Sequence, residues 1–153
     1  MRIKCIAIGN RIMGDDGIGI KVLEELSQEL EECKIEVIIG ETDFDYGLSK
    51  IAEGDMLFII DSTYFNIDPG TVTFTPIEKA FNNQWQIYSQ HQPSLINLLH
   101  TYKKSVKGYI IGIEVEKIHF CLDLSETLKE KFLDICEEIH KFIIQTIRGI
   151  QDA

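Results

Sequence analysis

Two aspartates and one histidine, far apart in the sequence, have side chains that could together bind a metal ion. Asp16 lies in a loop between glycines, Asp61 directly follows the apolar run 56–60, and His91 precedes a segment with helical spacing. Carboxylate oxygens and an imidazole nitrogen suit a borderline divalent ion such as nickel or zinc, with positions left open for a substrate or water. Asp16, Asp61 and His91 are therefore the candidate metal site of this sequence.

Each of these residues also has a structural interpretation. Asp15 or Asp16 could cap the helix that follows, or lie in its first turn, which would contribute on the order of 1 kcal/mol. Asp61 could accept hydrogen bonds from loop amides, and His91 could be an ordinary loop histidine. A metal site requires in addition that the fold brings the three side chains together.

The elements that would position these residues alternate between strands and helices. Four short apolar runs are typical of buried parallel strands: 3–8, 35–39, 56–60 and 109–113. Segment 71–75 alternates like a half-buried strand, antiparallel at one edge. Helical spacing marks four further segments: 18–30, 46–52, 95–102 and 125–147, the last with Ser125 suited to its N-cap.

This alternation predicts an α/β fold, with residues 1–153 forming a single three-layer α/β/α sandwich around a mostly parallel, twisted sheet. In such a sheet the carboxyl ends of the parallel strands lie at one edge, where open α/β sheets build their sites. That edge, together with the start of the helix that follows His91, would bring Asp16, Asp61 and His91 together. Residues 78–90 lack a clear period and are expected to form a mobile loop that, with residues 43–46, borders the substrate cleft.

The composition narrows the class of protein. Of the 153 residues, 44% are hydrophobic and 26% are charged, which is typical of a globular domain. The net charge of -10 disfavours nucleic acid and anionic membranes as partners. The sequence shows neither a signal-peptide core nor a long uncharged apolar stretch, so we expect a cytoplasmic protein. The four cysteines form no C-x-x-C pair and are expected to be buried.

Other common chemistries are not supported by the motifs. The glycines of residues 9–19 do not follow G-x-G-x-x-G, and no phosphate-binding G-x-x-x-x-G-K-[ST] loop occurs. Cys5 lies in an apolar strand without a nearby base, and no G-x-S-x-G serine elbow is present. His100, His119 and His140 are expected to be structural or surface residues.

The ordered set of motifs resembles the hydrogenase maturation endopeptidases, which trim the C-terminal extension from the nickel-loaded large-subunit precursor of a nickel-iron hydrogenase. The resemblance covers most of the chain. It is carried by Gly9-Asn10 and by five further segments: 14–19, 58–61, 69–72, 89–92 and 111–114.

The resemblance implies that Asp16, Asp61 and His91 contact the metal, and it makes the same three residues the candidates for catalysis. It also implies that the nickel is supplied by the precursor and that no organic cofactor is needed. One departure is segment 41–47, where the family often has a Gly-Gly-Thr-like turn. Asp43 and Asp45 in this segment could alter substrate choice or add a carboxylate near the cleft.

Two alternatives stay open at this point. The first is a chaperone or metal-sensing binding module that holds the large subunit without cutting it, because the sequence shows no recognisable nucleophile. The second is a related spore-type peptidase with the same sheet and a different substrate.

Overall fold

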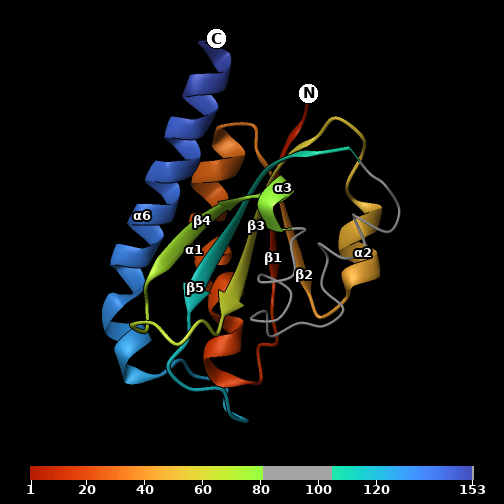
Figure 1. The fold of residues 1–153 in the computed structure, drawn as a ribbon. Coiled ribbons are helices and arrows are strands. Elements are labelled where there is room, and N and C mark those ends of the chain that lie inside the picture. The colour runs from red at the N-terminus through yellow and green to blue at the C-terminus, as the bar shows by residue number, and fades with distance from the viewer. Residues whose placement is uncertain (81–104, 153) are drawn as a thin grey trace.

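The computed structural model describes residues 1–80 and 105–152, which form a five-stranded sheet with the strand order β2-β1-β3-β5-β4 (Figure 1). The strands are β1 (Ile3–Ile8), β2 (Glu36–Glu41), β3 (Met56–Thr63), β4 (Val72–Pro76) and β5 (Lys107–Glu114). Neighbouring strands run parallel except for β4, which pairs antiparallel with β5 at the edge. The predicted parallel sheet with an antiparallel edge strand is confirmed.

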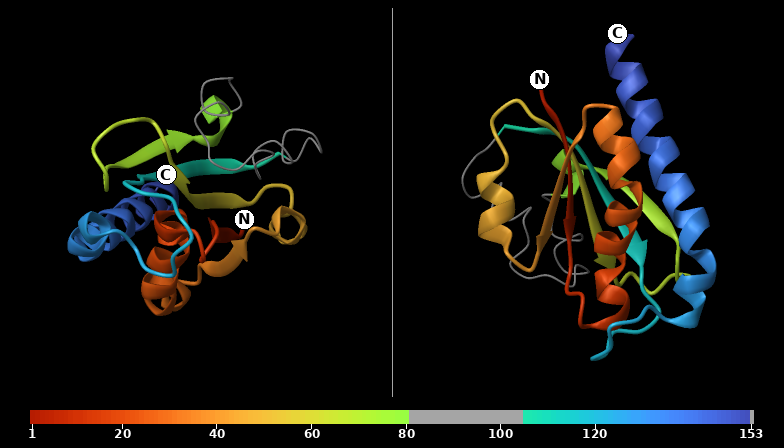
Figure 2. Two further views of the ribbon diagram at one scale, coloured as in Figure 1. Left: turned by 90° about the horizontal axis from the view of Figure 1, so that it is seen from below. Right: turned by 180° about the vertical axis from the view of Figure 1, so that it is seen from behind.

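Helices cover both faces of this sheet, as the two views in Figure 2 show. Helices α1 (Ile18–Glu32) and α6 (Glu126–Gln151) lie side by side on one face. The short helices α2 (Phe44–Ser49) and α3 (Ile77–Ala80) belong to the other face, and the single-turn 3-10 helix η1 (Gly14–Gly17) leads from β1 into α1. The predicted three-layer arrangement is therefore confirmed.

Two apolar clusters hold these layers together. Successive side chains of β1 point to opposite faces of the sheet, so this strand contributes to both clusters. Cys5 and Ala7 face the cluster formed with α1 and α6, whereas Ile6 and Ile8 face the cluster on the side of α2 and α3. The central strand β3 is buried along its whole length, as expected of a parallel strand covered on both faces. This burial makes β3 a rigid support for the polar residues at its carboxyl end.

Two helix starts follow from their capping residues. Ser125 accepts a hydrogen bond from the backbone N–H of Leu128 at 3.3 Å, which confirms it as the N-cap of α6. Asp43 caps α2 by accepting from the N–H of Tyr46 at 2.9 Å. The helix predicted over residues 46–52 consequently begins at Phe44 and ends at Ser49.

The structure corrects several other boundaries. Strand β3 continues through Asp61 to Thr63, because pairing with β5 extends past the apolar run. The predicted loop 78–90 is wrong at its start, since Ile77–Ala80 is helical. The rest of that loop and the predicted helix 95–102 lie outside the described residues. Among the cysteines, Cys5 and Cys136 are buried as expected, but Cys33 is exposed and Cys121 is only partly covered.

Residues 1–80 and 105–152 contain no helix with the length and apolarity required to cross a lipid bilayer.

Candidate metal site

The two candidate carboxylates lie where the direction of chain connection changes across the sheet. From β1 the chain passes through α1 to β2 on one side, and it then returns to β3 on the other side of β1. The carboxyl ends of β1 and β3 therefore border a topological switch point, where open α/β sheets bind their ligands. Asp16 follows β1 in η1, and Asp61 lies near the carboxyl end of β3.

Asp16 is 5% exposed and holds two segments together. One carboxylate oxygen, Oδ2, accepts a hydrogen bond from the N–H of Asn10 at 3.0 Å, and the other, Oδ1, accepts from the hydroxyl of Ser62 at 2.6 Å. The loop after β1 is thereby fastened to the end of β3. Gly9 permits this close approach, because a Cβ on Gly9 would stand 2.3 Å from the backbone oxygen of Asp16.

Asp61 is 4% exposed and lies beside the same serine. Its Oδ1 accepts a hydrogen bond from the backbone N–H of Ser62 at 2.7 Å. Leu57 and Ile59 face the cluster on the side of α2 and α3, so strand alternation directs Asp61 to that face and Ser62 to the face of α1. Ser62 thus reaches Asp61 with its amide and Asp16 with its hydroxyl.

Ser62 was not identified from the sequence, although its position directly after Asp61 at a strand end was a usable signal. A hydroxyl between two buried carboxylates can donate to only one of them. Here the hydroxyl donates to Asp16 and the backbone N–H serves Asp61. An ionised carboxyl group offers about four acceptor positions, so one hydrogen bond does not by itself prevent a carboxylate from contacting a cation.

Asp15 has a structural role that differs from the predicted helix cap. Helix α1 has no side-chain cap. The fully buried Asp15 instead accepts hydrogen bonds from three backbone N–H groups of the loop between β5 and α6: Glu116 at 3.0 Å, Lys117 at 2.9 Å and Ser125 at 2.7 Å. The cap interpretation is therefore wrong for both acidic residues of η1.

Glu114 fastens the loop between β3 and β4 in a similar way. This residue ends β5 and is 2% exposed. Its carboxylate accepts hydrogen bonds from four donors: the hydroxyl of Thr63 at 2.9 Å and the N–H groups of Phe65 at 2.9 Å, Asn66 at 3.0 Å and Ile67 at 3.4 Å. No spacing in the sequence indicated this role, because the partners lie about fifty residues earlier in the chain.

Arg11 connects the loop after β1, which leads to Asp16, to two further elements. Its guanidinium contacts Glu24 of α1 at 2.9 Å and Glu41 of β2 at 2.5 Å. The hydrogen bond to Glu24 raises the pKa of Arg11, partial burial lowers it, and the hydrogen bond to Glu41 raises it again, so that the net direction is upward. The loop that carries Asp16 is therefore held from both sides.

The structure brings together two of the three predicted metal-site residues. Asp16 and Asp61 share Ser62, whereas His91 lies outside the described residues. Within residues 1–80 and 105–152 no group of three His, Cys, Asp or Glu side chains is placed to hold a metal ion. The described part of the site thus consists of a pair of buried carboxylates, and contact of either with a metal ion stays a prediction.

The other polar candidates have different surroundings. Asp43 is occupied in capping α2, and Asp45 lies exposed in the first turn of that helix. His119 is exposed, and His140 lies half-buried beside Glu29 at 3.3 Å, in keeping with surface histidines. His100 lies outside the described residues.

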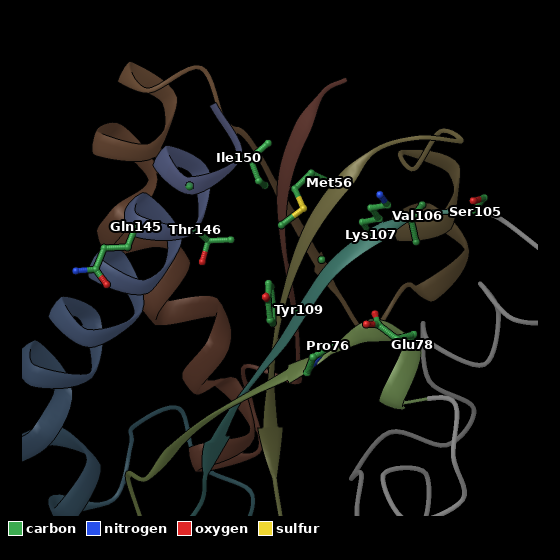
Figure 3. A pocket seen from close by; sticks show the side chains of 12 residues that line it. Met56, Pro76, Glu78, Ser105, Val106, Lys107, Tyr109, Gln145, Thr146 and Ile150 are labelled. Carbon is green, nitrogen blue, oxygen red and sulfur yellow. The ribbon is translucent and has the colours of Figure 1, made fainter. Parts of the chain in front are cut away.

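A cavity of about 720 Å³ lies at the opposite edge of the sheet and does not belong to this site (Figure 3). It is lined by the first residues of β3 and β5, including Met56 and Lys107, and by Gln145 and Thr146 of α6. Neither Asp16 nor Asp61 lines it. We therefore identify the candidate site by the position and hydrogen bonds of Asp16 and Asp61 rather than by the size of a cavity.

Comparison with known proteins gives consistent matches. The family model described as HycI, hydrogenase maturation protease, matches residues 20–142. A protein of Methanocaldococcus jannaschii that is provisionally named a hydrogenase maturation protease is 22% identical over 149 residues, covering 95% of this chain and 96% of its own length.

Two solved structures share the fold. The hydrogenase maturating endopeptidase HybD from E. coli superposes with a TM-score of 0.76 at 22% identity, covering 95% of this chain and 94% of that one. The [NiFe] hydrogenase maturation protease HybD from Thermococcus kodakarensis gives a TM-score of 0.73 at 23% identity, covering 93% and 99%.

Proposed function

Because this chain belongs to the hydrogenase maturation protease family and is therefore a hydrolase, we propose that it removes the C-terminal extension of the nickel-loaded large-subunit precursor of a nickel-iron hydrogenase. The observation that carries this proposal is the pair of buried carboxylates, Asp16 and Asp61, joined through Ser62 at the switch point of the sheet. A paired oxygen-ligand site at this edge suits a substrate that presents a divalent metal ion.

In this proposal the nickel is part of the substrate, and Asp16, Asp61 and His91 contact it. The two carboxylates are shielded from bulk water, which strengthens their attraction for a cation compared with exposed aspartates. A precursor without nickel lacks this attraction and binds more weakly. The site thereby distinguishes a loaded precursor from an empty one before the peptide bond is cut.

The test is the intact mass of a purified nickel-loaded precursor before and after incubation with the protein, beside a nickel-free control. We expect the loaded precursor to lose a C-terminal peptide and the nickel-free precursor to keep its mass. An unchanged mass of the loaded precursor, with a folded protein and a matched substrate, would contradict the proposal. Stable co-purification with the uncut precursor would instead support the chaperone alternative.

The proposal includes a cytoplasmic location for this reaction. Cell fractionation tests that part separately. Recovery of the protein in the soluble cytoplasmic fraction is the expected result, and recovery with the membrane or outside the cell would contradict it.

A further inference from the structure

Exposed apolar side chains are concentrated on the segments that follow the carboxyl ends of the strands. The described residues include nine large hydrophobic side chains that are exposed to solvent. Six of the nine lie on segments that follow the carboxyl ends of β1, β2, β3 and β5: Ile12, Tyr46, Tyr64, Ile67, Phe120 and Leu122. We call these six residues the apolar rim. Gathered apolar exposure of this kind marks an interaction surface more often than scattered single residues do.

The most exposed part of the apolar rim is joined directly to the loop of the candidate metal site. Phe120 is 80% exposed and Leu122 is 69% exposed. Between them, Cys121 donates its N–H to the backbone oxygen of Ile12 at 2.9 Å and accepts from the N–H of Gly14 at 2.8 Å. Apolar side chains from two loops therefore lie beside the 3-10 turn that contains Asp16.

Buried carboxylates hold two loops of the apolar rim in place. Asp15 accepts three backbone N–H groups from the loop that carries Phe120 and Leu122. Glu114 accepts three from the loop that carries Tyr64 and Ile67. Loops ordered in advance lose little conformational entropy when a partner binds, so their apolar side chains contribute more fully to affinity.

We propose that the apolar rim is the surface on which the folded body of the precursor docks while its nickel reaches Asp16 and Asp61. This inference rests on the proposed function and specifies how that substrate is recognised. The partner surface would be apolar and neutral or basic, because this chain carries a net charge of -10. The apolar rim supplies affinity for the precursor protein, and the carboxylate pair detects its nickel ion.

A matched pair of leucines provides the test. Leu122 lies on the apolar rim and is 69% exposed, whereas Leu133 lies on α6, in a groove shared with α1, and is 70% exposed. We expect Leu122→Ser, and more strongly Phe120→Ser with Leu122→Ser, to raise the KM for the loaded precursor by roughly tenfold with little change in kcat, because binding common to ground and transition states is lost. Leu133→Ser should leave both constants unchanged.

The Kd for the precursor, measured by calorimetry for the same proteins, separates the two proposals. Cleavage by the wild type with equal KM and Kd for all variants would overturn the docking surface and leave the proposed function standing. Binding without cleavage by the wild type would overturn the proposed function, and a weaker Kd only in the rim variants would then still support the surface. If the wild type neither binds nor cuts the loaded precursor, both proposals are overturned.

Discussion

At the scale of single residues, Ser62 connects the two candidate metal carboxylates by hydrogen bonds. Its hydroxyl donates to Asp16 at 2.6 Å and its amide donates to Asp61 at 2.7 Å, so both carboxylates have defined orientations. Ordered hydrogen bonds to the groups that contact a metal reduce the reorganisation needed on binding. The neighbouring Asp15 accepts three backbone N–H groups and so fastens the loop between β5 and α6. Two adjacent aspartates therefore carry different roles.

The first prediction concerns the candidate metal contacts. Asp16→Asn and Asp61→Asn should each slow processing of the nickel-loaded precursor by about 100-fold or more, since loss of even a supporting group around a metal costs about 10 to 100-fold. His91→Ala should act similarly. Thermal unfolding should show that all three variants fold, and intact mass against time gives the rate. Full activity in all three variants would contradict the assigned contacts.

At the scale of the elements, a buried ion pair connects β1 to the segment before β3. Lys4 and Asp55 approach to 2.7 Å, with side chains 6% and 4% exposed. Lys4 also donates to the backbone oxygen of Lys50 at 2.5 Å, and Asp55 accepts from the N–H of Ala52 at 2.7 Å. The pair thus anchors the turn that leads from α2 into β3.

The second prediction tests this anchor. Lys4→Met should lower the free energy of unfolding by about 3 to 5 kcal/mol, because it leaves the Asp55 carboxylate buried without its cation. Lys129→Met, which removes an exposed pair with Glu126 on α6, should change it by less than about 1 kcal/mol. Urea unfolding measures both. Equal effects of the two substitutions would show that burial of the Lys4 pair is unimportant.

The elements also show which parts of the architecture could be predicted from the sequence. The strand pattern predicted β1, β3, β5 and the antiparallel edge strand, because apolar periodicity directly records burial. The role of Asp15 could not be predicted, since its partners lie about a hundred residues later in the chain. Asp43 is a helix cap, a role that a short polar side chain commonly takes, and its predicted place near the cleft stays a prediction. The metal contacts of Asp16, Asp61 and His91 stay predictions.

At the scale of the whole molecule, the cysteines differ in burial and therefore in expected reactivity. Burial raises the pKa of the Cys136 thiol to about 12, with a further rise from Glu25. Burial alone raises the pKa of the fully buried Cys5. Cys33 is exposed on the surface. Alkylation requires the thiolate. Burial therefore protects Cys5 and Cys136 in two ways, because it blocks access of the reagent and disfavours the thiolate form.

The third prediction follows from these pKa shifts. At pH 8, iodoacetamide should modify Cys33 rapidly, and it should modify Cys5 and Cys136 only after unfolding exposes them and returns their pKa to roughly 8.5. Peptide mass spectrometry locates the label. Because the folded protein keeps protons that the unfolded chain releases, the free energy of unfolding should fall as pH rises from about 8.5 toward 12. Rapid labelling of Cys136 in the folded protein would contradict its burial.

The N-terminus and the last turn of α6 both lie near the amino edge of the sheet, opposite the carboxyl ends of β3 and β5 (Figure 1). Asp61 lies near that end of β3, and Asp16 follows the carboxyl end of β1. The cavity lining shows the same arrangement, since Ile150 lies near Met56 at the start of β3. An affinity tag or a biosensor tether at either end of the chain would therefore leave the carboxyl edge facing the solution. The molecule can be immobilised in a uniform orientation, with its candidate recognition surface presented to a passing partner.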